Sequence, residues 1–478
     1  MNRRRLCVIG LDCAAPELVF EQLTPRLPNL SGLMRRGRWG RLQSTDPPIT
    51  VPAWVSMASG LDPGQLGLYG FRNRPDHSYA PLALASAQGV GVPRLWDMAS
   101  QAGLCSTVLG LPLTWPASAV RGAMVAGFPL PENADGLTWP RSLGPRLERW
   151  GGGPYIVDVP DFRRADRAAL AQTVRTMVQR RFAVARGLWR LYDPDLLWLV
   201  EMGTDRMHHA FWRHHDPLHR LHQPGSPLAG AIASHYEDLD AQIGLLLAEL
   251  PPETLVLVVS DHGARRLEGG LCINQWLLER GLLRLRVEPA EGAPLAPAMI
   301  DWPRTKVWSD GGYYARIFCN VAGREPQGAV DPAAYDAFLA ELRAELEAMP
   351  GPDGRPLGNR VVDPRQAYAA VNGAAPDLLL YPGDLAWRAI GQVWPRGGPL
   401  FVQDNDSGPD DANHAPEGLF IAAPAAGQAL AQAGRQHHGA TLYDVCPTAC
   451  SWLGLDPPAK GRGRPWPWLD QLDRPRGR

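Results

Sequence analysis

Short apolar runs that end in turn residues alternate along this chain with longer stretches of helical periodicity. Parallel strands need a crossover connection, usually a helix, so this alternation is typical of an α/β fold with a mostly parallel central sheet and helices on both faces. The predicted strands are Leu6–Leu11, Ser106–Gly110, Ala123–Gly127, Leu196–Glu201, Leu255–Ser260, Asp377–Tyr381 and Leu419–Ala422. The predicted long helices are Ala165–Tyr192, Ser234–Leu250 and Ala334–Met349.

Proline- and glycine-rich stretches indicate how the chain is divided. A loop over residues 289–303 leads into a smaller segment, and a second loop over residues 351–357 lies within it. At 478 residues the chain is long enough for one large α/β domain with a sizeable core. We therefore expect a core made of residues 1–304 and 369–470, a small inserted cap segment over residues 305–368, and a frayed tail over residues 471–478.

Composition narrows the choice of partners. The 48 Lys and Arg against 49 Asp and Glu give a net charge of -1, so no overall field attracts a nucleic-acid polymer, and an anionic substrate must be held locally. No apolar stretch approaches the roughly 18 residues of a membrane span. The seven cysteines lack paired spacing, which favours free thiols in a reducing compartment. The basic start leads to no cleavage site, so we expect a cytoplasmic location.

Two polar residues follow early predicted elements. Asp12 comes directly after Leu6–Leu11, and ligands of open α/β sheets gather at the carboxyl ends of strands. Thr50 precedes a proline-initiated helix that ends at Gly60, so its hydroxyl would lie in the positive end of the helix dipole. Because a free hydroxyl is a poor nucleophile, metal coordination would have to lower its pKa. The alternative for both residues is a helix N-cap.

Two pairs follow predicted buried strands. Asp205 and His209 stand four apart, so they share one face of a helical turn and can bind one ion. Asp261 and His262 are adjacent, and their side chains converge only if the strand ends there, which Gly263 permits. The alternatives are a surface contact for the first pair and a polar turn for the second.

His414 ends a loop over residues 405–414 that is rich in Asp and Asn. Oxygen donors also suit calcium, but the loop lacks the spacing and the terminal glutamate of an EF-hand. His414 is therefore a candidate ligand for a transition ion. Three carboxylates, three imidazoles and one hydroxyl suit two zinc-like ions and a threonine nucleophile. The complete candidate set is Asp12, Thr50, Asp205, His209, Asp261, His262 and His414.

These motifs, in this order, resemble the alkaline phosphatase superfamily and, within it, the type I phosphodiesterase/nucleotide pyrophosphatase family. The similarity runs nearly from end to end, through Val8-Ile-Gly-Leu-Asp12, Pro48-Ile-Thr50-Val-Pro-Ala-Trp54, Thr204-Asp205-Arg206, Ser260-Asp-His-Gly263 and Asp444-Val-Cys-Pro-Thr448. The resemblance implies that Thr50 attacks phosphorus in line and forms a phosphothreonyl intermediate, which water then hydrolyses. It implies a small phosphoric ester or a nucleotide as substrate. It also implies two zinc sites, one of Asp12, Thr50, Asp261 and His262, and one of Asp205, His209 and His414.

The chain departs from characterised nucleotide pyrophosphatases after Gly60. Leu66 stands where those enzymes have a histidine, and Phe71 stands where they have an asparagine that binds a phosphoryl oxygen. Arg72 and Asn73 are the candidates to replace that contact. The nucleotide specificity is therefore left open by the sequence.

Other functions compete with a phosphodiesterase. A phosphomonoesterase or a phosphoglycerate mutase belongs to the same superfamily, but the mutase uses a serine and a much larger inserted domain. A catalytically silent metal-binding protein would lack Thr50 or a ligand. A dinucleotide-binding oxidoreductase would need a G-x-G-x-x-G motif after the first strand, and none follows. We therefore expect a metal-dependent phosphodiesterase or pyrophosphatase.

Overall fold

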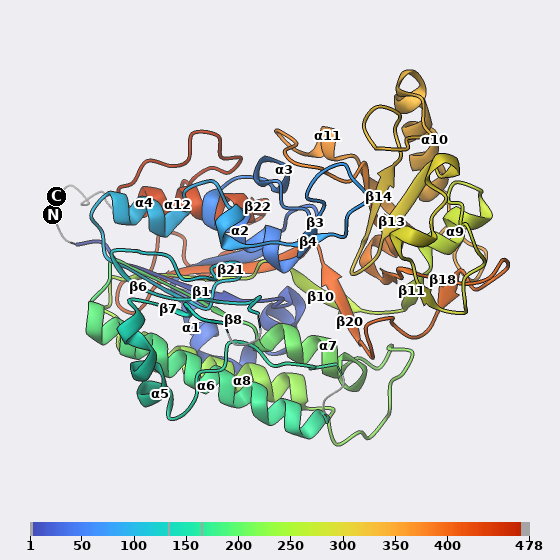
Figure 1. The fold of residues 1–478 in the computed structure, drawn as a ribbon. Coiled ribbons are helices and arrows are strands. Elements are labelled where there is room, and N and C mark those ends of the chain that lie inside the picture. Colours follow the sequence, from blue (N-terminus) through green and yellow to red (C-terminus); the bar gives the residue numbers. More distant parts are fainter. Residues whose placement is uncertain (1–2, 132–133, 164–165, 470–478) are drawn as a thin grey trace.

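The computed structural model describes residues 3–131, 134–163 and 166–469, so the tail predicted over residues 471–478 lies outside the described residues. A large sheet between two layers of helices forms the main lobe (Figure 1). A smaller lobe, residues 269–402, lies beside one end of that sheet, where Figure 1 shows it in yellow and gold. Among the described residues, none of the helices is both long and apolar enough to cross a bilayer.

The main sheet has nine strands in the order β22-β2-β21-β9-β1-β8-β5-β6-β7. β21 and β7 run antiparallel to their neighbours, and the other strands run parallel to β1. The predicted α/β fold with a mostly parallel sheet is therefore confirmed. The strands are β22 Ala440–Thr441, β2 Arg38–Gln43, β21 Glu417–Pro424, β9 Leu255–Val259, β1 Leu6–Leu11, β8 Leu196–Glu201, β5 Ser106–Leu109, β6 Gly122–Val125 and β7 Thr138–Trp139.

Helices cover both faces of this sheet (Figure 1). The long helix α6 buries Leu170, Val174, Met177 and Val178, whose spacing places them on one face, so the helix packs by an apolar stripe. One layer contains α1 Pro28–Arg36, α5 Gly144–Gly151, α6 Arg167–Tyr192, α7 Gly203–His215 and α8 Ala231–Leu247. The other layer contains α2 Thr50–Ser59, α4 Leu95–Gln101 and α12 Val445–Leu453.

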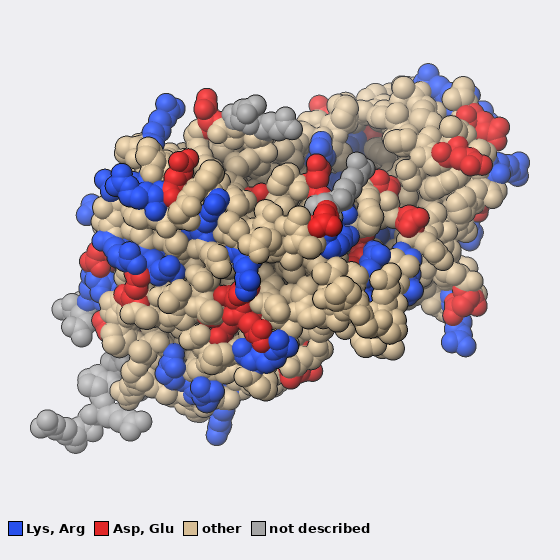
Figure 2. Space-filling view, turned by 90° about the horizontal axis from the view of Figure 1, so that it is seen from below, with Lys and Arg blue, Asp and Glu red and all other residues tan. Residues whose placement is uncertain are grey.

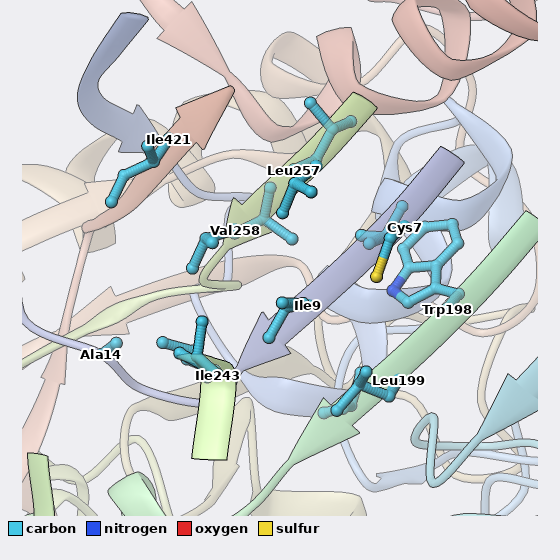
Figure 3. Packing of buried hydrophobic residues seen from close by; sticks show 14 of the residues in the cluster. Cys7, Ile9, Ala14, Trp198, Leu199, Ile243, Leu257, Val258 and Ile421 are labelled. Atoms are coloured by element: carbon cyan, nitrogen blue, oxygen red, sulfur yellow. The ribbon is translucent and has the colours of Figure 1, made fainter. Parts of the chain in front are cut away.

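The core of the main lobe lies on β1 and its neighbours. Every side chain of β1, β8 and β9 is buried, as expected for parallel strands that are covered on both faces. Figure 3 shows Ile9 of β1, Leu199 of β8 and Val258 of β9 packing with Ile243 of α8. These three strands are therefore held rigidly in register, and their carboxyl ends form a fixed edge.

The smaller lobe is built on an antiparallel sheet with the order β13-β14-β16-β15. Its apolar core is separate from that of the main lobe and draws on residues from Leu271 to Ala389. The strand predicted at Asp377–Tyr381 belongs to this sheet, so its assignment to the main sheet is wrong. The reason is that an apolar run does not specify the strand with which it pairs.

The division into residues 1–304, 305–368 and 369–470 stays a prediction. The elements are β13 Val307–Asp310, β14 Ala315–Cys319, β15 Arg360–Val362, β16 Leu378–Tyr381, α9 Ile273–Glu279, α10 Tyr335–Glu347 and α11 Pro364–Ala367.

Short elements join the two lobes. β10 pairs with β20 between them, and β3 with β4 forms a hairpin that faces the smaller lobe. Figure 2 shows basic and acidic side chains interspersed on the face seen from below, rather than gathered in a patch of one sign. The remaining short elements are α3 Pro63–Leu66, β3 Arg72–Asn73, β4 Ala83–Leu84, β10 Gly263–Arg266, β11 Gly269–Leu271, β12 Ala293–Pro294, β17 Trp387–Ala389, β18 Gln392–Val393, β19 Phe401–Val402 and β20 Ala412–Ala415.

Candidate metal centre

Three neighbouring strands deliver polar residues to one edge of the main sheet. In the register of this edge, Gly10 of β1 pairs with Val259 of β9, and Leu11 pairs with Glu201 of β8. Asp12 follows β1 directly, Asp261 comes two residues after β9, and the helix that carries Asp205 begins two residues after β8. The parallel order of the strands therefore brings three carboxylates into one crevice.

The structure gathers six of the seven predicted residues into two groups, Asp12 with Asp261 and His262, and Asp205 with His209 and His414. Within each group the potential ligand atoms lie within 4.8 Å of one another. The two groups are adjacent, because the rings of His262 and His414 stack with their centroids 3.8 Å apart. All six side chains are buried.

His414 reaches the centre through a long-range pairing. It lies on β20, where it pairs with Ala264 of β10, two residues after His262. This antiparallel ladder places His414 beside His262, although the two residues are far apart in the sequence. The sequence predicted His414 as a ligand from its loop, and the ladder explains which group it joins.

Thr50 is the first residue of α2, and its hydroxyl lies 3.5 Å from His262 Nε2. The N-cap position belongs to Ile49, so the alternative reading of Thr50 as an N-cap is wrong. Its side chain is only 3% exposed and lies at the positive end of the helix dipole. The hydroxyl is thus buried beside the first group, where neighbouring amides favour negative charge.

Trp54, one turn further along α2, fixes Asp12. Its indole Nε1 donates a hydrogen bond to Asp12 Oδ2 at 2.7 Å. The helix approaches β1 closely, since a Cβ atom on Gly10 would lie 2.5 Å from the Trp54 ring. One helix therefore positions both the candidate nucleophile and a candidate metal ligand. The sequence analysis did not recognise this role of Trp54, although the residue ends one of its motifs.

The three histidines present the same ring nitrogen to the centre. Nδ1 of His262 faces Gly263 O at 3.1 Å, Nδ1 of His414 faces Pro48 O at 2.9 Å, and Nδ1 of His209 faces an oxygen of Asp410 at 2.6 Å. Because these partners are acceptors, each Nδ1 is assigned as the protonated donor. Nε2 of each ring is therefore the nitrogen that is positioned to bind a metal ion.

The polar atoms that remain without partners show that the residues fit a metal. Among the described residues, Asp12 Oδ1, Asp261 Oδ2 and His209 Nε2 are buried and have no hydrogen-bond partner. Leaving such atoms unsatisfied is costly, and carboxylate oxygen with imidazole nitrogen is a donor set that suits zinc and similar ions. One divalent cation in each group would satisfy these atoms.

The pKa shifts of the first group agree with this requirement. Burial raises the pKa of Asp12, and the charge of Asp205 raises it further. Burial also raises the pKa of Asp261, and the charge of Asp12 adds to the effect. Burial lowers the pKa of His262 to about 4, so its ring is a neutral ligand. A bound cation would favour the carboxylate forms and reverse the shifts of the two acids.

A buried carboxylate that the sequence analysis missed supports His209. Asp410 contacts His209 Nδ1 through one oxygen, and its other oxygen accepts from Arg163 at 3.0 Å and from Arg388 at 2.8 Å. Arg163 also donates to the Tyr313 hydroxyl at 2.6 Å, and the Tyr313 ring stacks on His414 with centroids 4.1 Å apart. One network therefore orients two ligands of the second group.

Arg206 is a further site residue that the sequence did not single out. It donates to both oxygens of Asp158, at 2.8 and 2.6 Å, and to Asp205. Its guanidinium lies 4.5 Å from the centroid of the Phe162 ring. The only indication in the sequence was that Arg206 directly follows Asp205. Its guanidinium holds Asp205 and the segment that contains Asp158 and Phe162.

Arg72 and Asn73 lie outside both groups. Asn73 accepts from Tyr69 N at 2.8 Å and donates to Gly70 O at 3.2 Å, so its amide stabilises its own turn. Arg72 is exposed and lines a hollow against the smaller lobe. A role of either residue in holding a phosphoryl oxygen stays a prediction.

Comparison with known proteins places the site in a family. The model of the type I phosphodiesterase / nucleotide pyrophosphatase family matches residues 6–410. No curated protein matches the chain. The matched range contains six of the seven candidate residues, and His414 lies four residues beyond it.

We predict that Asp410→Asn weakens zinc binding by about 10–100-fold, because the carboxylate that orients His209 loses its charge. Zinc affinity should be measured by competition with a chelating dye on metal-stripped protein.

Asp411→Asn is the matched control. This neighbouring carboxylate is also buried and also accepts from an arginine, Arg213 at 2.7 Å, but its side chain contacts no ligand of the two groups. Equal losses of zinc affinity in both variants would show a general effect on folding and would contradict the positioning role of Asp410.

Proposed function

The chain belongs to the type I phosphodiesterase/nucleotide pyrophosphatase family, and from this premise we propose that it hydrolyses a phosphoric diester or anhydride with Thr50 as nucleophile and two zinc-like ions as cofactors. The family supports the coarser statement that the protein is a phosphoric ester hydrolase that depends on metal ions. The identity of the ions, the nucleophile and the diester preference are parts of the proposal.

The observation that carries the proposal is the common orientation of three imidazoles beside a buried hydroxyl. His209, His262 and His414 each have Nδ1 occupied by an acceptor, and Thr50 Oγ1 lies 3.5 Å from His262 Nε2. A silent binding protein has no need of a hydroxyl at this position. The arrangement supports a site in which a cation held by Asp12, Asp261 and His262 would activate Thr50.

In the proposed reaction, Thr50 Oγ1 loses its proton to solvent and bonds to phosphorus as the bond from phosphorus to the leaving oxygen breaks. Water then cleaves the phosphothreonyl bond and regenerates Thr50. When bound, the two ions would lower the pKa of the hydroxyl and stabilise charge on the attacking and leaving oxygens. Trp54 holds Asp12, and the first turn of α2 favours negative charge at Thr50.

Charge around the site favours a diester over a monoester. A monoester dianion needs an additional cation or basic side chain near the metals. The stretch Val51–Phe71 contains no Lys or Arg. Arg206 is held by Asp158 and Asp205, while Arg163 and Arg388 are both held by Asp410. Each of these arginines beside the second group is therefore already paired with a carboxylate.

We expect Thr50→Ala to lower kcat by on the order of 10³-fold or more, because the nucleophile is removed, while metal content stays near that of the unmodified protein. Thr50→Ser should keep part of the activity, since its hydroxyl survives. Steady-state kinetics and metal analysis on the purified proteins provide the test. Near-normal turnover by Thr50→Ala would show that the covalent mechanism is wrong.

We expect a chelator to remove activity and zinc to restore it. Magnesium alone should restore little, because three imidazole ligands suit borderline ions better than a hard ion that prefers oxygen. The measurement is turnover of metal-stripped protein after addition of each ion. Full recovery with magnesium in the absence of zinc would overturn the assignment of His209, His262 and His414.

We expect kcat/KM for bis(4-nitrophenyl) phosphate to exceed that for 4-nitrophenyl phosphate by about tenfold or more, because Arg163, Arg206 and Arg388 are all paired with carboxylates and are not free to bind the second charge of the monoester. Both substrates should be assayed at one pH and one zinc loading. A clear preference for the monoester would refute the proposed diester specificity.

A further inference from the structure

A cavity of about 300 Å³ lies where the β3–β4 hairpin of the main lobe meets the β13–β14 hairpin of the smaller lobe. We call it the aromatic hollow. It lies outside the two metal groups, and its size reaches the lower end of the range of small-molecule sites. The lining residues that matter for the argument are Arg72, Tyr79, Trp302, Trp308, Ser309 and Asp310.

The aromatic walls of the hollow are fixed in place. Tyr79 and Trp302 stack with centroids 3.7 Å apart, and Trp308 stands nearly perpendicular to both rings. The Tyr79 hydroxyl donates to Asn320 at 2.8 Å and accepts from Gln327 N at 3.0 Å. A ligand would therefore meet preformed ring surfaces, which suit a flat aromatic group.

Two arginines line the hollow, but only one is available to a ligand. Arg74 is buried and forms an ion pair with Glu325 at 3.2 Å, so its charge is neutralised within the protein. Asp310 is likewise paired, with Arg316. Arg72 is exposed, and among the described residues its guanidinium has neither a carboxylate nor a hydrogen-bond acceptor as partner. The hollow therefore offers one uncompensated positive charge beside its rings.

The hairpin that lines the hollow also reaches the metal centre. Asp310 is followed three residues later by Tyr313, which stacks on His414. Three residues of extended chain span at most about 10 Å. Arg316, on β14 of the same hairpin, donates to the Arg72 carbonyl and ties the two hairpins together. The hollow and the residue that packs on the second metal group therefore lie on the same hairpin.

We propose that the aromatic hollow binds the far end of the leaving group of the substrate, and that this end is a flat aromatic ring with an anionic group close to it. Trp308 contacts the ring, and Arg72 pairs with the anion. This inference rests on the proposed function, because it assumes that the metal centre cleaves the ester. It identifies the substrate as an extended ester that carries a second negative charge away from the reacting phosphorus.

The hollow can be tested without catalysis by measuring the binding of naphthalene-1-sulfonate to metal-stripped protein by isothermal titration calorimetry. This probe has a flat ring and an anionic group, contains no phosphorus, and finds no cation in the metal groups. We expect Arg72→Ala and Trp308→Ala each to weaken its binding by about fivefold to tenfold. Trp308→Phe should lose less, because a ring remains. Methanesulfonate, which lacks the ring, and 1-naphthol, which lacks the charge, should both bind more weakly.

The matched control for charge is Arg355→Ala, which removes an arginine whose side chain is 86% exposed and which lies outside the hollow. It should leave the binding of naphthalene-1-sulfonate unchanged. Equal affinity in the unmodified protein, Arg72→Ala and Trp308→Ala would overturn the site. Equal affinity for naphthalene-1-sulfonate and 1-naphthol would overturn the role of Arg72.

The link to the substrate needs a separate measurement on the zinc-loaded protein. With the methyl phosphodiester of 6-hydroxynaphthalene-2-sulfonate as the extended ester, whose leaving group is a flat ring system with an anionic group, naphthalene-1-sulfonate should raise KM and leave kcat unchanged. An unchanged KM at saturating sulfonate would overturn the leaving-group assignment. Turnover of bis(4-nitrophenyl) phosphate reports on the proposed function alone. If that turnover is absent while the sulfonate binds, the proposed function fails and the hollow stands as a binding site.

Discussion

The burial of three carboxylates in one crevice is the constraint on which the rest of the centre depends. Asp12, Asp205 and Asp261 are at most 2% exposed, and a buried carboxylate is stable only when other groups compensate its charge. The protein supplies part of that compensation, through the Trp54 indole to Asp12, the Cys13 amide to Asp261, and Arg206 to Asp205. Within the described parts of the chain, Oδ1 of Asp12 and Oδ2 of Asp261 have no hydrogen-bond partner. In Asp12 and in Asp261, one carboxylate oxygen accepts a hydrogen bond and the other does not. The oxygens that accept none are therefore available to cations.

The charges that surround this place cancel one another. Asp410 lies between Arg163 and Arg388, and Arg206 lies between Asp158 and Asp205. Since these pairs are buried or nearly so, solvent screens them weakly, and a missing partner would leave an uncompensated charge next to the ligands. The net positive charge that a substrate meets at the second group is therefore set by the ions rather than by free arginines. The arginines can therefore hold Asp205 and Asp410 in position without attracting a phosphate.

The sequence predicted what is local and missed what depends on long-range contacts. The bounds of β1 and β8 were predicted to the residue, and their ends located Asp12 and Asp205, because an apolar run followed by a polar residue is a local signal. The roles of Trp54, Tyr313 and Asp410 were not predicted, since each of these residues contacts a candidate ligand that is more than 40 positions away in the sequence. The carboxylates of residues 405–414 were considered only as possible calcium ligands, whereas in the structure Asp410 contacts His209. The strand at Asp377–Tyr381 was placed in the wrong sheet for the same reason, because pairing is a property of two segments.

The two lobes contribute different parts of the site. The main lobe holds the reacting groups on rigid strand ends and on one helix, where a shift of a ligand would disturb the chemistry. The smaller lobe reaches the centre through the β13–β14 hairpin, which places Tyr313 on His414 and also supplies Trp308 and Asp310 to the aromatic hollow. Tyr313 constrains a ligand, whereas the hollow lies on the same hairpin but outside the ligand groups. Substitutions in the hollow can thus alter which ester is bound while the ligand geometry stays fixed.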